Sequence, residues 1–269
     1  MSVLEIERND GIMVLRMNRP ERLNALNSEL RGALAEAWTE FRDSRDLEVA
    51  IFTGTGRAFC AGEDMKESVE RGTVGAGTDP RASLPNPYND GTLDKPVIVA
   101  VNGFCMGGGF KLAERADLRV AVRGATFESS EAKRWLLGGY DHGYGGCFSH
   151  TVATEMAFAF RFTAERLYEI GFLNRLTDAD GLLPSAREMA EHLMTLPPAS
   201  RINTLTMMRA LRQQVPAELE ELAARLKDHG AKSDLMESRK AFAEKRKPQF
   251  KGWDRPEDRF RTPKLKRAG

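Results

Sequence analysis

Two glycine-bearing segments, each placed directly after an apolar run, constrain the fold of this chain most strongly. The apolar runs, residues 49–53 and 96–101, are short and rich in β-branched side chains. Such runs predict strands that are buried on both faces of a parallel sheet. The segments that follow, residues 54–67 and 101–111, carry glycines that let backbone N–H groups approach a ligand closely. Because open α/β folds keep ligands at the carboxyl ends of their strands, the two segments together predict an oxyanion hole.

The bulk composition excludes several classes of protein. A chain of 269 residues with 41% apolar side chains can bury a sizeable core. Its 40 basic and 39 acidic residues nearly cancel, so we expect neither nucleic acid nor a membrane as a partner. The chain has no apolar leader at its amino terminus and no apolar run of about 18 residues, and we therefore expect a cytoplasmic protein.

The cysteines and histidines give no metal-binding pattern. Cys60, Cys105 and Cys147 are an odd number without the spacing of metal ligands, which predicts free, buried thiols. The four histidines form no recognisable zinc motif. We therefore expect no metal site.

The first half of the chain alternates strand and helix patterns. Residues 3–15 predict a β-hairpin that turns at an Asn-Asp-Gly sequence. Asn27 or Ser28 can cap a helix. The apolar face of that helix comprises Leu30, Leu34, Ala37, Trp38 and Phe41. A helix is predicted at residues 107–115 and a strand at residues 118–122, and this repeated order of strand, turn and helix predicts an α/β core.

Two further stretches of the chain have a different pattern. Residues 68–92 hold many glycines and prolines, too broken for a regular element, and we expect a mobile flap beside the first glycine segment. Beyond about residue 163 the apolar residues recur at helical spacings and no further strand is indicated. A Leu-Pro-Pro sequence near residue 197 marks a boundary between a core, residues 1–195, and a helical region with a basic tail, residues 196–269.

Four sequence blocks, taken in order, resemble those of the crotonase family, the enoyl-CoA hydratase/isomerase superfamily. They are residues 18–26 (NRPERLNAL), 58–67 (AFCAGEDMKE), 94–109 (from DKPVI to GGG) and 241–246 (AFAEKR). The resemblance implies an α/β fold that is a spiral of β-β-α repeats, with a helical carboxyl-terminal region for assembly into trimers or dimers of trimers. It implies an enzyme, a lyase or isomerase of the kind used in fatty acid metabolism. Its substrate would be a coenzyme A thioester, so that no separate cofactor is required.

The resemblance also implies roles for individual residues. The two oxyanion donors of the family match the backbone N–H groups of Glu63 and Gly108, and its second catalytic glutamate matches Glu131. The residues that match the coenzyme A site are Arg22, Leu23, Ala61, Asp64 and Met65, with Phe242 and Lys245 from the terminal helix. As surface and helix residues, all seven also have an ordinary structural explanation.

Two departures from the family pattern affect the chemistry. The first family glutamate would stand where this chain has Lys111, which can pair with Glu114 or face Glu131 and lower the pKa of that carboxylate. The loop at residues 136–146 is also altered. There, Asp141 or His142 can supply a further acid or base, or can be an exposed polar residue of a glycine-rich turn.

These departures leave more than one function open. The leading hypothesis is double-bond isomerisation or atypical hydration, with Glu131 moving a proton while the amides of Glu63 and Gly108 hold the thioester enolate. Addition of water normally uses two carboxylates, and only one is present at the matching positions. Lys111 motivates the alternative of a catalytically silent regulator that binds acyl-CoA.

Overall fold

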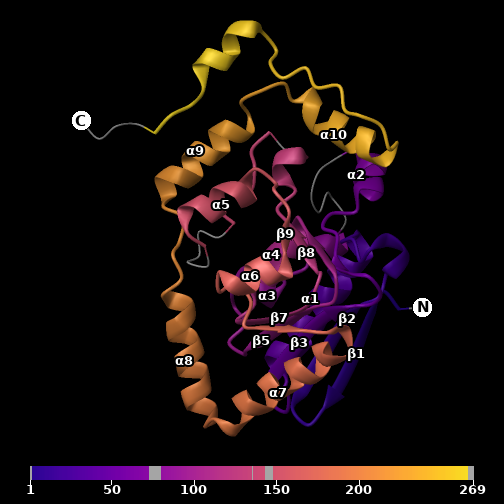
Figure 1. Cartoon of the computed structure of the whole chain (residues 1–269), viewed down its shortest axis with the longest axis vertical. Coiled ribbons are helices and arrows are strands. Elements are labelled where there is room, and N and C mark those ends of the chain that lie inside the picture. Colours follow the sequence, from indigo (N-terminus) through magenta and orange to yellow (C-terminus); the bar gives the residue numbers. More distant parts are fainter. Residues whose placement is uncertain (1, 73–79, 135, 143–147, 266–269) are drawn as a thin grey trace. The chain divides into compact units, whose positions relative to one another are not determined.

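The chain forms two compact units, each assembled from three segments of the sequence (Figure 1). Unit 1 comprises Met1–Asp64, Gly75–Glu128 and Arg161–Arg212, and unit 2 comprises Met65–Val74, Ser129–Phe160 and Gln213–Gly269. The computed structural model describes residues 2–72, 80–134, 136–142 and 148–265. The predicted division of the chain after residue 195 stays a prediction.

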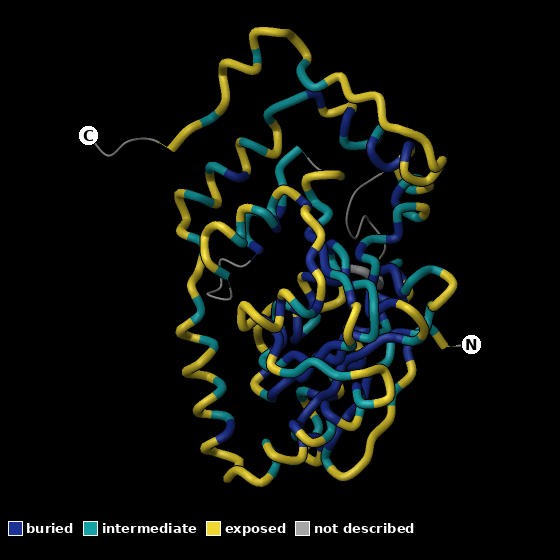
Figure 2. The backbone as a smooth tube through the Cα atoms, in the orientation of Figure 1, coloured by how far each residue is buried: buried dark blue, intermediate teal, exposed yellow. Residues whose placement is uncertain are grey.

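A six-stranded sheet forms the centre of unit 1. Its strands, in spatial order, are β1 (Leu4–Asn9), β2 (Ile12–Met17), β3 (Val49–Gly54), β5 (Val97–Val101), β7 (Leu118–Val122) and β10 (Arg175–Thr177). The predicted hairpin is confirmed, since β1 runs antiparallel to β2, and every other neighbouring pair is parallel. Every residue of β3 and β5 is buried (Figure 2), as the two apolar runs predict.

A second sheet of four short strands accounts for the glycine segments. It comprises β4 (Ala58–Cys60), β6 (Phe104–Met106), β8 (Thr126–Glu128) and β9 (Phe162–Thr163), of which only β9 runs antiparallel to its neighbour. Each of β4, β6 and β8 follows a strand of the main sheet after a short turn. This repeated pair of strands, with helices after it, confirms the predicted α/β class.

Helices cover both faces of the main sheet. α7 (Leu182–Thr195) packs with Ile51 of β3 in one apolar cluster. The next residue is Phe52, whose ring instead packs edge-on against the Trp38 ring of α1 (Ser28–Asp43), with 5.4 Å between the ring centroids. Because successive strand residues face opposite sides, α1 and α7 cover opposite faces. The predicted cap of α1 is confirmed, since the Asn27 side chain accepts a hydrogen bond from the Leu30 N–H.

The remaining helices of unit 1 are short, apart from one. They are η1 (Pro20–Arg22), η2 (Pro80–Ser83), α3 (Pro87–Asp90), α4 (Gly108–Arg115), α6 (Ala164–Glu169), η4 (Ala179–Gly181) and the longer α8 (Pro198–Ala210). α4 confirms the helix predicted after the second glycine segment.

Unit 2 is helical in the part of the chain that the structure describes. Its helices are α2 (Met65–Arg71), η3 (Glu131–Lys133), α5 (His150–Ala157), α9 (Ala217–Lys227), α10 (Ser233–Ala243) and η5 (Pro256–Arg261). Arg239 of α10 is fully buried, and its guanidinium donates to the Ser68 hydroxyl of α2 at 3.2 Å and to the Arg134 carbonyl at 3.0 Å. None of the helices in the described residues is long and apolar enough to cross a membrane.

The prediction that no strand follows residue 163 is wrong. Residues 175–177 form β10, which pairs in parallel with β7 at the edge of the main sheet. The Asn174 side chain accepts from the Arg119 N–H at 2.7 Å, and the Arg123 N–H donates to the Thr177 carbonyl at 2.8 Å. Three residues are too few to show a two-residue period, so tertiary pairing decides this strand.

The prediction that residues 68–92 hold no regular element is also wrong for part of that segment. α2 extends to Arg71, and α3 begins after Asn86, whose side chain accepts from the N–H groups of Tyr88 and Asn89. This cap, together with the burial of Tyr88, stabilises a helix of a single turn. η2 also lies in the predicted mobile flap, and residues 73–79 of that segment lie outside the described residues.

Candidate active site

The two glycine segments meet in unit 1, at the ends of β4 and β6. Gly62 has φ +88°, and a Cβ atom built there would lie 2.9 Å from the Met106 carbonyl oxygen and 3.1 Å from the Gly108 nitrogen. At Gly109 a Cβ atom would lie only 2.3 Å from the carbonyl oxygen of Cys60. Side chains at either position would force the segments apart, so the glycines permit this approach.

The hydrogen bonds around Glu63 set the direction of its peptide group. The Leu26 N–H donates to the Gly62 carbonyl at 2.7 Å, and the Asp64 N–H donates to the Leu26 carbonyl at 3.2 Å. In a parallel bridge of this kind, the residue between those two partners directs its own N–H to the opposite side. The Glu63 N–H therefore points away from Leu26.

Gly108 supplies the second predicted donor from the start of a helix. α4 begins at Gly108, and its first backbone bond runs from the Lys111 N–H to the Gly107 carbonyl at 3.1 Å. The Gly108 N–H thus belongs to the first turn, where amide groups point outward and the helix dipole is positive. Two amide-bearing segments that adjoin in this way can hold an oxygen atom that gains negative charge.

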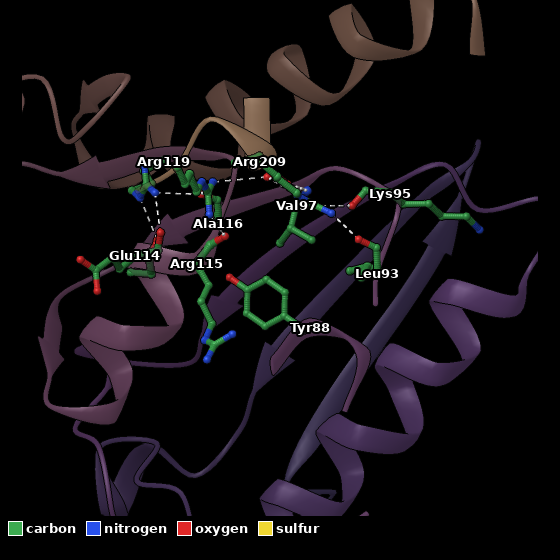
Figure 3. A network of polar contacts seen from close by, with 12 residues as sticks. Tyr88, Leu93, Lys95, Val97, Glu114, Arg115, Ala116, Arg119 and Arg209 are labelled. Carbon is green, nitrogen blue, oxygen red and sulfur yellow. Dashed lines mark hydrogen bonds and ion pairs between the residues drawn. The ribbon is translucent and has the colours of Figure 1, made fainter. Parts of the chain in front are cut away.

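A buried arginine fixes the other end of α4. The Arg119 guanidinium donates to the carbonyl oxygens of Ala113, Glu114 and Ala116 at 2.8, 2.6 and 2.8 Å. Figure 3 shows Arg119 beside Glu114 and Ala116, with Arg209 of α8 reaching the same region. A cation at the carboxyl end of a helix also complements the helix dipole. The helix that carries Gly108 is therefore held firmly at its carboxyl end.

Glu131 lies in unit 2 within a small polar cluster. Its Oε2 accepts a hydrogen bond from the Ser129 hydroxyl at 2.7 Å, and its Oε1 lies 3.4 Å from Nε2 of His142. His142 is 1% exposed, whereas the Glu131 side chain keeps 23% of its surface accessible. Burial alone would raise the pKa of Glu131, but the hydrogen bond and charge of His142 and the Ser129 hydroxyl outweigh it and lower the pKa.

The altered loop brings His142 to this carboxylate. A Cβ atom at Gly139 would lie 2.2 Å from Cδ2 of His142 and 2.4 Å from the Ser129 hydroxyl oxygen. The His142 N–H donates to the Gly139 carbonyl at 3.2 Å, which closes a tight turn. The absence of a side chain at Gly139 therefore lets the imidazole pack beside Ser129 and reach Glu131.

The sequence predicts Asp141 as a residue of the site, with His142 as its alternative. Asp141 is half-buried on the same turn, and its catalytic role stays a prediction. No sequence signal identified Ser129 as a partner of Glu131, because a serine two residues away is common. Residues 143–146 of the altered loop lie outside the described residues.

Four of the predicted coenzyme A residues come together in unit 1. The Ala61 N–H donates to the Leu23 carbonyl at 3.0 Å, and Arg22 donates to the Asp64 carboxylate at 3.0 Å. Asp64 is 3% exposed and is also paired with Arg19 at 3.0 Å. Its role in the structure is therefore to position the two arginines. Arg19 was missed in the sequence, although it lies in the first of the family-like blocks.

The other predicted site residues lie on separate elements. Met65 begins α2 in unit 2. Phe242 near the end of α10 is 54% exposed and lies beneath the Arg134 guanidinium at 4.5 Å, and Lys245 follows it with φ +55°. Lys111 is exposed in the first turn of α4 in unit 1. Their roles, and the pairing of Lys111 with Glu131, stay predictions.

The thiols and acidic groups give no metal centre in the described residues. Cys60 and Cys105 are free and buried, as predicted, and Cys147 lies outside those residues. Burial raises the pKa of the Cys60 thiol to about 11 and that of Cys105 well above its ordinary value. Across residues 2–72, 80–134, 136–142 and 148–265, no three His, Cys, Asp or Glu side chains cluster as metal ligands would.

Comparisons with known proteins find relatives that match nearly the whole chain. The family model described as enoyl-CoA hydratase/isomerase matches residues 7–254. The chain is 34% identical over 257 residues to a mevalonyl-coenzyme A hydratase of Aspergillus fumigatus, covering 89% of this chain and 91% of that protein. It is 34% identical over 265 residues to a carnitinyl-CoA dehydratase of Salmonella agona, covering 93% of this chain and 98% of that protein. A solved structure of carnitinyl-CoA hydratase from Mycobacterium avium aligns with a TM-score of 0.78 and 26% identity, over 93% of this chain and 99% of that one.

Proposed function

This chain belongs to the enoyl-CoA hydratase/isomerase family of enzymes, and from that premise we propose that it hydrates and dehydrates the acyl group of a coenzyme A thioester through an enolate. The observation that carries the proposal is the close approach of Gly62 to Gly108 at the ends of β4 and β6. It supports an oxyanion hole made of the Glu63 and Gly108 amides. As the α-carbon becomes an enolate, negative charge develops on the thioester oxygen, and such donors then bind it more strongly.

Glu131 is the proposed acid and base at the α-carbon. In the dehydration direction its carboxylate removes the α-proton, and in the hydration direction its protonated form returns that proton. The lowered pKa of Glu131 favours the carboxylate, which suits proton removal at neutral pH. His142 is proposed to hold this carboxylate in place and ionised, with Ser129 as the second support.

Isomerisation of a double bond is the second candidate, and Lys111 favours it. Addition of water normally uses a second carboxylate, and the position expected for it carries an exposed lysine. A single carboxylate suffices to move a proton between the α- and γ-carbons. For hydration, Asp141 is the proposed second acid or base. If neither reaction occurs, the chain is an acyl-CoA-binding regulator.

The coenzyme A moiety is proposed to lie beside Arg22, Leu23 and Ala61, with Asp64 positioning Arg22 for a phosphate group. Met65, Phe242 and Lys245 are proposed to complete this site. We also propose that the protein acts in the cytoplasm as a trimer or a dimer of trimers, and that it uses no separate cofactor.

The test compares three substrates with one purified enzyme. Crotonyl-CoA, 3-hydroxybutyryl-CoA and a 3-enoyl-CoA report hydration, dehydration and isomerisation. We expect the enzyme to interconvert crotonyl-CoA and 3-hydroxybutyryl-CoA. Glu131→Gln should lower the rate of this reaction by at least about a hundredfold, and the exposed control Glu169→Gln should retain it. Conversion of the 3-enoyl ester alone would establish isomerisation instead. Tight binding of all three esters without turnover would support the regulator.

A further inference from the structure

A cavity of about 350 Å³ lies in unit 1. The leucines that line it are Leu26, Leu34, Leu84 and Leu112. Their side chains give an apolar wall, and the volume is near the lower end of the range for small-ligand sites, about 300–1,000 Å³. The cavity therefore suits a short chain.

Leu26 connects this cavity to the proposed oxyanion hole. Its backbone bridges the Glu63 peptide, and its Cδ1 lies 3.4 Å from the place that a Cβ atom on Gly108 would take. Leu112 lies on α4, one turn beyond Gly108. A thioester oxygen held at the two amides would thus have this cavity beside it, ready to receive its acyl chain.

Two charged side chains also line the cavity, and they differ in their surroundings. Asp90 is exposed, and its Oδ1 accepts hydrogen bonds from the Thr92 N–H at 3.0 Å and the Thr92 hydroxyl at 2.7 Å. Arg31 is half-buried on α1, one turn after the cap residue Asn27. Arg31 therefore places a cation on the wall of the cavity.

The part of the cavity wall that α3 and α4 form is firmly held. The Tyr88 hydroxyl of α3 donates to the Leu112 carbonyl of α4 at 2.6 Å, and Arg115 donates to the Asn89 carbonyl at 2.5 Å. Figure 3 shows Tyr88 and Arg115 below the end of α4, and the Tyr88 ring stacks on Trp38 of α1 at 4.6 Å. α3, α4 and α1 are thus tied together, so the cavity is preformed.

We propose that Arg31 makes this enzyme selective for a short acyl-CoA whose chain ends in a carboxylate. A guanidinium binds a carboxylate through two parallel hydrogen bonds, which gives both affinity and geometric selection. The apolar wall accepts the methylene carbons between the thioester and the charged end. The same cation disfavours an acyl group that ends in a quaternary ammonium. This inference rests on the proposed function, because it assigns the acyl group of that same site.

The first experiment measures kcat/KM for three enoyl-CoA esters that differ at the chain end. Glutaconyl-CoA carries a carboxylate, 2-pentenoyl-CoA has the same chain length without charge, and crotonobetainyl-CoA carries a trimethylammonium. We expect glutaconyl-CoA to be preferred over 2-pentenoyl-CoA by about ten- to a hundredfold, mainly through KM, with crotonobetainyl-CoA poorest. In Arg31→Met the preference for the carboxylate should disappear, and Arg31→Lys should retain part of it. The control Arg42→Met removes an exposed arginine from the same helix and should keep the preference. Equal use of the first two esters by the unmodified enzyme, or a preference that survives Arg31→Met, would overturn the proposal.

A second measurement separates this proposal from the proposed function. Calorimetric titration with succinyl-CoA and butyryl-CoA, which lack a double bond, reports selection without turnover. Tighter binding of succinyl-CoA that is lost in Arg31→Met would support the role of Arg31 even in a protein that turns over none of the esters. Equal binding of the two saturated esters would refute it, even if hydration of 2-pentenoyl-CoA is fast.

Discussion

Nε2 of His142 lies 3.4 Å from Oε1 of Glu131, although the two residues belong to different turns of the chain and His142 is almost wholly buried. This pair makes the altered loop part of the proposed chemistry. A histidine whose hydrogen bond and charge favour the ionised carboxylate determines at which pH that carboxylate can act as a base.

Replacing His142 should shift the pH dependence of turnover. His142→Gln removes the charge that holds the Glu131 pKa down, so burial would dominate and the pKa of Glu131 would rise. We expect the acidic limb of the kcat/KM profile to move to higher pH, with the loss of rate greatest below neutrality. His150→Gln, at an exposed histidine of α5, is the matched control. An unshifted acidic limb in His142→Gln would show that this pair does not control the proton step.

The same pair should contribute to stability in a defined pH window. Because the pKa of Glu131 is lowered in the folded protein, its contribution is present above the ordinary pKa of a glutamate and is lost as the pH falls through the lowered value. Chemical denaturation at pH 7 and at pH 3 measures this. Glu131→Gln should lower the free energy of unfolding more at pH 7 than at pH 3. An equal loss at both pH values would contradict the prediction.

Adding one methyl group at Gly109 should disturb the proposed oxyanion hole. In Gly109→Ala the new Cβ would lie 2.3 Å from the Cys60 carbonyl oxygen, so β4 and α4 must separate. We expect the free energy of unfolding to fall by about 1–3 kcal/mol, and kcat to fall by about a hundredfold as one donor moves. In the control Gly181→Ala, the new Cβ meets Thr177 at 3.4 Å, an ordinary contact, and both quantities should change little.

Asp64 should matter for stability and for coenzyme A binding together. Asp64→Asn leaves two guanidinium groups, those of Arg19 and Arg22, without the buried carboxylate that pairs them. Breaking a buried pair in this way costs about 3 kcal/mol, less here because Arg22 is 37% exposed. The KM for the thioester should also rise. The exposed pair of Arg42 and Asp43 offers the control, and Asp43→Asn should change the unfolding free energy by less than about 1 kcal/mol.

Tyr88 should stabilise the wall of the cavity without taking part in turnover. Tyr88→Phe removes the hydroxyl that donates to the Leu112 carbonyl, a hydrogen bond that is buried in the folded protein. We expect the free energy of unfolding to fall by about 1–2 kcal/mol, measured by urea denaturation. The exposed Tyr168 is the control, since Tyr168→Phe removes no hydrogen bond of this kind. If Tyr88→Phe is as stable as the unmodified protein, the hydrogen bond between α3 and α4 does not contribute to the free energy of unfolding.

The sequence predicted best those elements whose patterns are local and long. α1 combines a cap, a helical period and a core face within one segment, and β3 and β5 are apolar at every position. β4, β6 and β8 were not predicted, because strands of three residues are too short to show a period. Those strands form because they pair with one another, and they are the ones that bring the glycine segments together.

The features of the candidate site also divide into those that the sequence predicted and those that depend on the fold. The glycines at residues 62, 107, 108 and 109 were evident as a sequence pattern, and so was the position of Glu131 within the family-like order of blocks. The support of Glu131 by His142 and Ser129 was not evident, because it depends on the path of a loop. The sequence did contain a signal for Arg31, because this charged residue lies at the edge of the apolar face of α1.

By itself, therefore, the sequence determined the α/β class, the family and the chain positions of the two glycine-bearing segments. Glycine placement and apolar periodicity act over a few neighbouring residues, so they can be recognised in the sequence alone. Only the tertiary structure decided which distant side chains meet: Gly62 with Gly108, Asp64 with Arg19 and Arg22, and Arg31 with the leucines of the cavity. Those contacts depend on strand register and on the packing of helices against sheets, which many local sequences fit equally well.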